Sequence, residues 1–193
     1  VVLSVLPRGR FPRPYYQHRT TGRRATRMKP LRFWLLALGF DAWWTLAVWG
    51  RERFILFLLL SSFLMLAFTP TRRRLWVATA CTLGIIMDSL WCILGLFEFT
   101  DSSAVPPWMM ALWLGFSAWW LWLLGNVQMK WYWLIPLGAF SGPLAYYLGM
   151  QLGAMQLLAT PVYVWLLLAA GWAIFLPLIS LPVLFNNPGL RKT

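Results

Sequence analysis

Residues 138–154 read GAFSGPLAYYLGMQLGA and predict a membrane helix with one face that is almost without side chains. At 100° per residue, five small residues fall within about 80° of arc on this helix: Gly138, Gly142, Ala145, Gly149 and Gly153. Small residues at four-residue spacing let helices approach each other closely. We therefore predict that this face packs against a neighbouring helix.

The composition places the rest of the chain in a membrane as well. Of its 193 residues, 60% are apolar and only 11% are charged, and the mean hydropathy is +0.64. A soluble domain of this size needs more polar surface. Six apolar runs are each near the ~20 residues that cross the hydrocarbon core. The expected fold is therefore an all-α bundle of six transmembrane helices, at about residues 31–49, 54–70, 75–97, 108–125, 132–152 and 161–182.

The N-terminal segment differs from everything that follows it. Residues 1–27 hold seven of the seventeen basic residues, no acidic residue and no periodic apolar pattern, so we predict a disordered basic leader. Met28 is the expected native start. The alternatives are a genuine basic arm lying on anionic lipid and an organelle transit peptide. Residues 28–185 form the expected membrane domain, and residues 186–193 a short cytoplasmic tail.

The basic residues after the leader flank the apolar runs and predict the orientation. With the N-terminus inside, Arg51 and Arg53 lie outside and eight basic residues lie inside: Lys29, Arg32, Arg72, Arg73, Arg74, Lys130, Arg191 and Lys192. This bias favours cytoplasmic N- and C-termini. The run Arg72 to Arg74 is interpreted as a topology signal, with binding of phospholipid headgroups as the alternative. These residues form no aromatic-interleaved groove, so we expect no nucleic-acid partner.

Two acidic residues lie inside the predicted spans, Asp41 in the first and Asp88 in the third. Counted along the helix rise, they lie about 15 and about 20 Å deep, so they could face each other. A charged aspartate at that depth is costly, and both are expected to turn inward. Asp88 also belongs to a predicted helix stripe of small and polar residues, formed with Cys81, Gly84, Cys92 and Gly95.

Three interpretations of this aspartate pair remain open. The acids could hydrogen-bond neighbouring helices as structural groups, or form a proton or cation relay in a small transporter. They could also form the dyad of an intramembrane aspartyl protease, although GFDA and IMDS lack the glycine-framed acid of such enzymes. Five glycines are predicted to lie where helices pack against each other: Gly84, Gly95, Gly138, Gly149 and Gly153.

A sharper hypothesis concerns the middle of the glycine-rich helix. There Gly142 and Pro143 are predicted to open a cavity that faces the Asp88 stripe, with Tyr146 at its edge.

The sequence gives little support for serine-protease or metal chemistry. The single histidine, His18, precedes every span, so no Ser/His dyad can form in the membrane. No metal-binding motif is present, and we expect no cofactor and no metal.

Six of the fifteen tryptophans are predicted to anchor helix ends at the membrane interface: Trp34, Trp49, Trp76, Trp108, Trp131 and Trp133.

Four segments together resemble a bacterial inner-membrane family known as domain of unknown function 2878. They are GFDAWWTLAVWG, MDSLWCILGLFEF, PPWMMALWLGF and SGPLAYYLGMQLGA, and the resemblance runs from about residue 28 to about residue 185. It implies a membrane location and a compact bundle, with no assigned reaction. It also implies a polar uncharged residue at the position where this chain has Asp41.

The expected function is that of an integral protein of the bacterial inner membrane, a structural or accessory component in envelope or membrane-lipid processes rather than an enzyme. The alternatives are a small proton-coupled transporter that uses Asp88 and, third, an intramembrane enzyme. The expected partners are membrane lipids, and a second copy of the chain or another membrane protein is possible.

Overall fold

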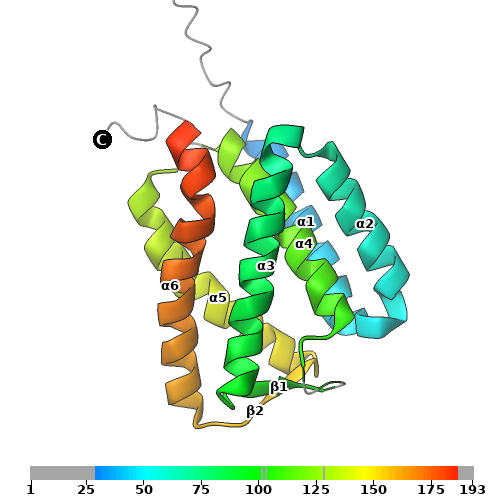
Figure 1. Cartoon of the computed structure of the whole chain (residues 1–193), viewed down its shortest axis with the longest axis vertical. Helices are drawn as coiled ribbons and strands as arrows, with labels where there is room; N and C mark the ends of the chain where they lie inside the picture. Colours follow the sequence, from blue (N-terminus) through cyan, green and yellow to red (C-terminus); the bar gives the residue numbers. More distant parts are fainter. Residues whose placement is uncertain (1–28, 101, 103, 128, 187–193) are drawn as a thin grey trace, which may run out of the picture.

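A computed structural model of the chain describes residues 29–100, 102, 104–127 and 129–186. These residues form six α-helices, two short 3-10 helices and two three-residue strands (Figure 1). The elements in chain order are α1 (Pro30–Gly50), η1 (Arg51–Phe54), α2 (Ile55–Phe68), α3 (Thr71–Ile93), β1 (Phe97–Phe99), α4 (Pro107–Asn126), η2 (Trp131–Trp133), α5 (Leu134–Gln151), β2 (Met155–Leu157) and α6 (Pro161–Asn186). The predicted leader, Met28, His18 and residues 187–193 lie outside the described part.

Three of the described helices are long and apolar enough to cross a membrane by length and composition: α3, α4 and α6 over Pro161–Phe185. These apolar helices indicate a membrane-embedded protein. The six-span prediction is thus supported only in part. Helix α2, for example, has 14 residues and rises about 21 Å, which is less than the thickness of a hydrocarbon core.

Helix α4 lies at the centre of the bundle (Figure 1), and most of its described residues are buried. It packs against α2 and α3 and also contacts α1 and α6, whereas α5 packs mainly against α6. Polar contacts support this packing. The Trp120 indole donates to Ser180 Oγ on α6 at 2.9 Å, and Ser62 Oγ on α2 donates to the Ala111 carbonyl at 2.7 Å. The central element is therefore α4, not the glycine-rich α5.

Two of the predicted packing glycines terminate helices instead. Gly95 and Gly153 have positive φ angles of 67° and 71° and lie just after α3 and α5. At each end the following amide donates to the carbonyl five residues back, from Leu96 to Trp91 and from Ala154 to Gly149, as in a Schellman cap. The third helix consequently stops at Ile93 rather than near residue 97. A Cβ at Gly95 or Gly153 would meet nothing within 4 Å, so the prediction that they pack against helices is wrong.

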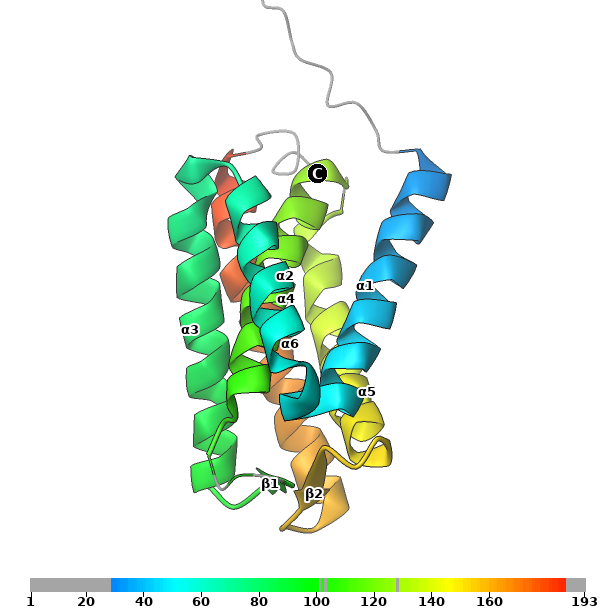
Figure 2. The same ribbon diagram turned by 90° about the vertical axis from the view of Figure 1, so that its right-hand side faces the viewer.

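Strands β1 and β2 form an antiparallel pair at one end of the bundle, with Phe97 opposite Leu157 and Phe99 opposite Met155. Arg51, between α1 and α2, donates from Nη1 to the Gly153 carbonyl at 2.6 Å and joins the α1–α2 connection to this end. Figure 2 shows that the arginine-rich connection between α2 and α3 lies at the opposite end, the same end at which α1 starts. The two ends of the bundle therefore differ in structure and in charge.

At that opposite end, two arginines of the predicted topology signal bind backbone carbonyls of α4 and of the C-terminal end of α2. The Arg74 guanidinium donates to the carbonyls of Ala67 and Thr69 where α2 ends, at 2.8 and 3.1 Å. Arg73 donates to the Leu121 carbonyl of α4 at 3.4 Å. Cations at helix C-termini also interact favourably with the helix dipole. Arg72 is exposed.

Large apolar side chains cover the outward faces of α1, α2, α3, α5 and α6, as a lipid-facing surface requires, whereas the central helix α4 exposes one large apolar side chain, Met110. The tryptophans expected at the interface divide into two groups. Trp34, Trp49, Trp76, Trp131 and Trp133 are exposed. Trp108 is only 2% exposed, because its ring packs edge-to-face on Phe99 of β1, so its assignment as an interface anchor is wrong.

Candidate functional site

The carboxyl group of Asp88 joins three helices inside the bundle. Asp88 lies on α3 and is completely buried. The Trp113 indole of α4 donates from Nε1 to Oδ2 at 2.7 Å, and the Tyr146 hydroxyl of α5 donates to Oδ1. Both carboxyl oxygens thus accept a hydrogen bond, which is how a membrane-embedded acid is best accommodated.

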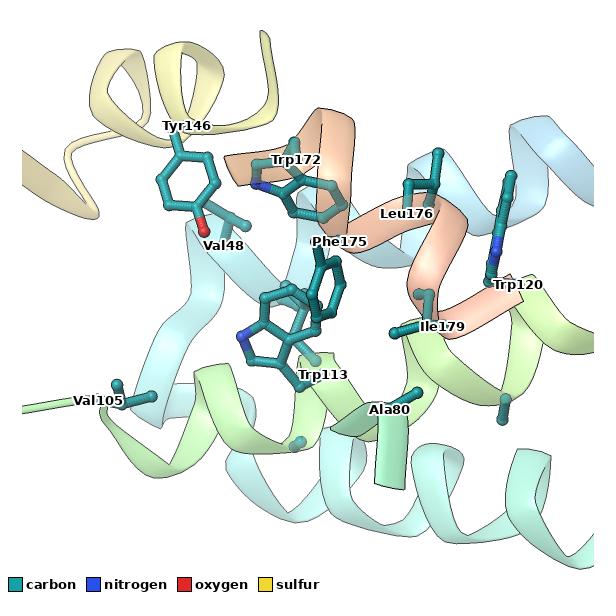
Figure 3. Packing of buried hydrophobic residues seen from close by; sticks show 14 of the residues in the cluster. Val48, Ala80, Val105, Trp113, Trp120, Tyr146, Trp172, Phe175, Leu176 and Ile179 are labelled. Carbon is teal, nitrogen blue, oxygen red and sulfur yellow. The ribbon is translucent and has the colours of Figure 1, made fainter. Parts of the chain in front are cut away.

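Aromatic rings surround the two donors of this network. Trp172 of α6 stacks on Trp113 with ring centroids 5.7 Å apart and meets Tyr146 edge-on at 6.4 Å. Phe175 of α6 packs edge-to-face on Trp113 at 5.3 Å (Figure 3). Because the rings are held on several sides, the indole and hydroxyl donors have little freedom to leave the carboxyl group.

Two predicted glycines make room for these indole rings. A Cβ on Gly84 of α3 would lie 2.2 Å from the Trp113 ring, and a Cβ on Gly142 of α5 would lie 2.1 Å from the Trp172 ring. Gly138 lies one turn before Gly142, and a Cβ added there would lie 2.3 Å from the Trp172 carbonyl oxygen. The glycine face of α5 thus packs on α6 at Gly138 and Gly142, whereas Gly149 on the same face lies near Met155 and Val48.

This packing corrects the hypothesis of a cavity opened by Gly142 and Pro143. The Trp172 indole fills the space beside Gly142, and Pro143 lies instead at a separate surface depression of about 380 Å³ between α5 and α6. Tyr146 does connect α5 to Asp88, but through its hydroxyl rather than across a cavity.

A larger cavity of about 450 Å³ lies between α1 and the helices α4, α5 and α6. Its lining extends from Val127 and Met129 at the α4–α5 connection to Phe99 and Met155 at the β-sheet. The cavity therefore runs along the bundle. Most of the lining is aromatic or aliphatic, and the α4 wall holds the residues Trp108, Met109, Leu112, Trp113, Phe116, Trp119, Trp120, Leu123 and Leu124. Tyr146, Gly149 and Trp172 also line it, whereas Asp88 does not.

Asp41 lies on the α1 wall of this cavity and not beside Asp88. It shares one face of α1, about 100° wide, with the other cavity residues of that helix, Phe33, Ala37, Phe40, Trp44 and Val48. Figure 2 shows α1 and α3 on opposite sides of the bundle, so the two aspartates cannot form the predicted facing pair. An aspartyl dyad is excluded for the same reason.

Sequence reasoning identified Asp88 and Tyr146 but missed Trp113 and Trp172, the rings that complete the site. Several of the tryptophans had been interpreted as interface anchors, and nothing in the pattern distinguishes a buried indole from an exposed one. A glycine four residues before Asp88 and another four before Tyr146 were visible signals of space near the site. Which side chains enter that space depends on how α4 and α6 dock.

Within the described residues, no group of three or more His, Cys, Asp or Glu side chains could hold a metal ion.

A family model described as protein of unknown function (DUF2878) matches residues 33–178. No curated protein and no solved structure matches the chain. The family match confirms the resemblance drawn from the four sequence segments.

Proposed function

The chain belongs to the DUF2878 family of proteins of unknown function, and we propose that it is an integral membrane protein that holds one lipid-like apolar molecule in the cavity beside α1. In this proposal the protein is an accessory component of membrane-lipid processes in the bacterial inner membrane, with six spans and cytoplasmic termini.

The outer surface and the two ends of the bundle support the six-span arrangement. The five helices around α4 present exposed apolar side chains outward, including α1, whose 21 residues rise about 31 Å. The basic residues Arg72, Arg73 and Arg74 lie at the same end as the start of α1. The positive-inside rule assigns that end to the cytoplasm.

The observation that carries the proposal is the cavity itself. Its volume of about 450 Å³ lies within the usual range of small-molecule sites, roughly 300 to 1,000 Å³. The lining is almost entirely apolar and runs along the bundle, so its shape and chemistry suit an elongated hydrocarbon. A space of this size between helices in a bilayer is filled by lipid or by a ligand, because a large apolar void loses packing energy.

In this proposal Asp88 has a structural role. Its two oxygens are engaged by Trp113 and Tyr146, and it does not reach the cavity, so the geometry favours the joining of three helices over a proton relay. The transporter alternative requires a change of solvent access at Asp88. Replacement by Asn would then abolish a proton-dependent flux in an intact protein.

The proposed binding site can be tested by a substitution on α1 that places a large side chain in the cavity. Ala37 lines the cavity, whereas Ala42 on the same helix is exposed and does not line it. We expect the wild-type protein and Ala42→Trp to retain the same lipid-like molecule through purification, as identified by mass spectrometry. Ala37→Trp is expected to retain about tenfold less, because the indole occupies the site.

Elution volume and melting temperature show whether both variants fold. Equal retention by folded Ala37→Trp and Ala42→Trp would place the molecule outside the cavity and contradict the proposal.

A further inference from the structure

We propose that the cavity selects a positively charged amphiphile, one with a protonated amine or a quaternary ammonium group and an apolar body, and that Asp41 binds the charged group. This inference rests on the proposed function, because it names the chemistry of the molecule that the same cavity holds.

The first observation is that the Asp41 carboxylate has no partner among the residues that the structure describes. Asp41 is an exposed residue near the middle of α1, on the face that lines the cavity, and no described donor forms a hydrogen bond or ion pair with its carboxylate. The polar contact of this residue is made by its backbone carbonyl, which accepts from Thr45 Oγ1 at 2.8 Å. Asp88, at a comparable predicted depth, has a donor on each oxygen.

An unpaired carboxylate inside a membrane is costly, and such groups pair with a cation or line a ligand pathway. Asp41 therefore needs a partner that the described part of the chain does not supply. A guest in the cavity can supply it.

The second observation is the sign of the charge along the cavity wall. Asp41 is the one charged residue among those that line the cavity, and the lining described here contains no Lys or Arg. The basic groups at the end of the bundle, Arg73 and Arg74, bind helix carbonyls outside the cavity. The cavity consequently favours a cationic guest and disfavours an anionic headgroup.

The third observation is the ring content of the wall around Asp41. Phe40 and Trp44 lie on the same face of α1, and Phe40 stacks on Trp119 of α4 at 4.0 Å between centroids and lies 6.2 Å from Phe116. The faces of such rings attract ammonium groups through the cation–π interaction, most strongly when water is absent. Carboxylate and aromatic rings together form a suitable site for an organic cation.

Two probes that differ mainly in charge test this inference. Dodecyltrimethylammonium carries a positive charge, and dodecyldimethylamine oxide has the same chain and no net charge. Binding of each to the full chain in lipid nanodiscs is measured below its micelle concentration. We expect the wild-type protein to bind the cation at least about tenfold more tightly, as a charge-assisted contact implies.

Asp41→Asn is expected to remove this preference while leaving the affinity for the amine oxide within about twofold. Asp41→Glu is expected to retain the preference, because it keeps the charge. Glu52→Gln is the control, since Glu52 is an exposed acid of η1 outside the cavity lining and its loss should change neither affinity.

Equal binding of both probes by the wild type, or an unchanged preference in Asp41→Asn, overturns the charge selection. If the probes then still fail to bind Ala37→Trp, the apolar cavity site stands and only the inference about charge is lost. If neither probe binds the wild type and no molecule is retained on purification, the proposed function is lost as well.

Discussion

At the scale of single residues, the aspartates of α1 and α3 differ in burial and in hydrogen bonding. Asp88 is enclosed and accepts hydrogen bonds from an indole and a hydroxyl on two other helices. Asp41 faces a cavity and has no donor among the described residues. The buried carboxyl group of Asp88, with both oxygens hydrogen-bonded, stabilises the fold, whereas the exposed carboxyl group of Asp41 at the cavity wall is available for a ligand.

Removal of the Tyr146 hydroxyl is expected to destabilise the protein. Tyr146→Phe leaves Oδ1 of buried Asp88 without its donor, so the free energy of unfolding should fall by about 1 to 3 kcal/mol. The neighbouring Tyr147→Phe is the matched control, because Tyr147 is 45% exposed and should change stability by less than about 0.5 kcal/mol. Unfolding in mixed micelles measures both values. Equal stability of the two variants would show that the Asp88 network contributes little.

At the scale of elements, α4 and α6 give the bundle its interior. Helix α4 contributes Trp113 and α6 contributes Trp172, and the two rings stack in the middle of the structure. Helices α3 and α5 contribute glycines against which these rings lie. Large indoles opposite glycines let four helices pack closely despite the size of the side chains.

A methyl group added at Gly142 should disrupt this packing. Its Cβ would lie 2.1 Å from the Trp172 ring, which is itself confined by Trp113 and Phe175, so we expect Gly142→Ala to lower the free energy of unfolding by about 1 to 3 kcal/mol.

The control for this change is Gly39→Ala on α1. A Cβ at Gly39 would meet nothing within 4 Å, and alanine in a helix interior is favoured over glycine by roughly 0.5 to 1 kcal/mol. The two variants should therefore change stability in opposite directions in the same unfolding assay. A stabilised Gly142→Ala protein would mean that Trp172 moves freely.

At the scale of the whole molecule, the bundle has a basic end and an end closed by a small β-sheet. Arg73 and Arg74 cap helix carbonyls at the first, and Arg51 binds the Gly153 carbonyl at the second (Figures 1 and 2). The cavity runs between these ends along the inner face of α1. An apolar guest would therefore lie along the membrane normal in the proposed orientation.

Single cysteines test this orientation. In a chain without Cys81 and Cys92, we expect Thr160→Cys and Glu52→Cys to react with a membrane-impermeant maleimide on intact cells. Thr71→Cys should react only after the membrane is opened. All three positions are exposed, and Thr71 lies at the basic end. Labelling of Thr71→Cys on intact cells would contradict the cytoplasmic location of that end.

The sequence alone determined the helical class, the approximate extent of the six helices and the presence of an acid within α3, because apolar length and small-residue spacing are local properties. It also indicated the family through four short segments. Gly95 and Gly153 show a limit of this reasoning. The same small residue that packs helices also caps them, and only the backbone conformation after α3 and α5 distinguishes the two roles.

Only the tertiary structure decided which side chains meet. Asp41 and Asp88 have similar predicted depths, yet the order of helices around α4 separates them and leaves one at a cavity. Gly142 marks a close contact in the sequence, but the docking of α6 decides that Trp172 occupies it. Periodicity fixes which residues share a helix face. Which face meets which neighbour depends on the simultaneous packing of all the helices, which no local pattern contains.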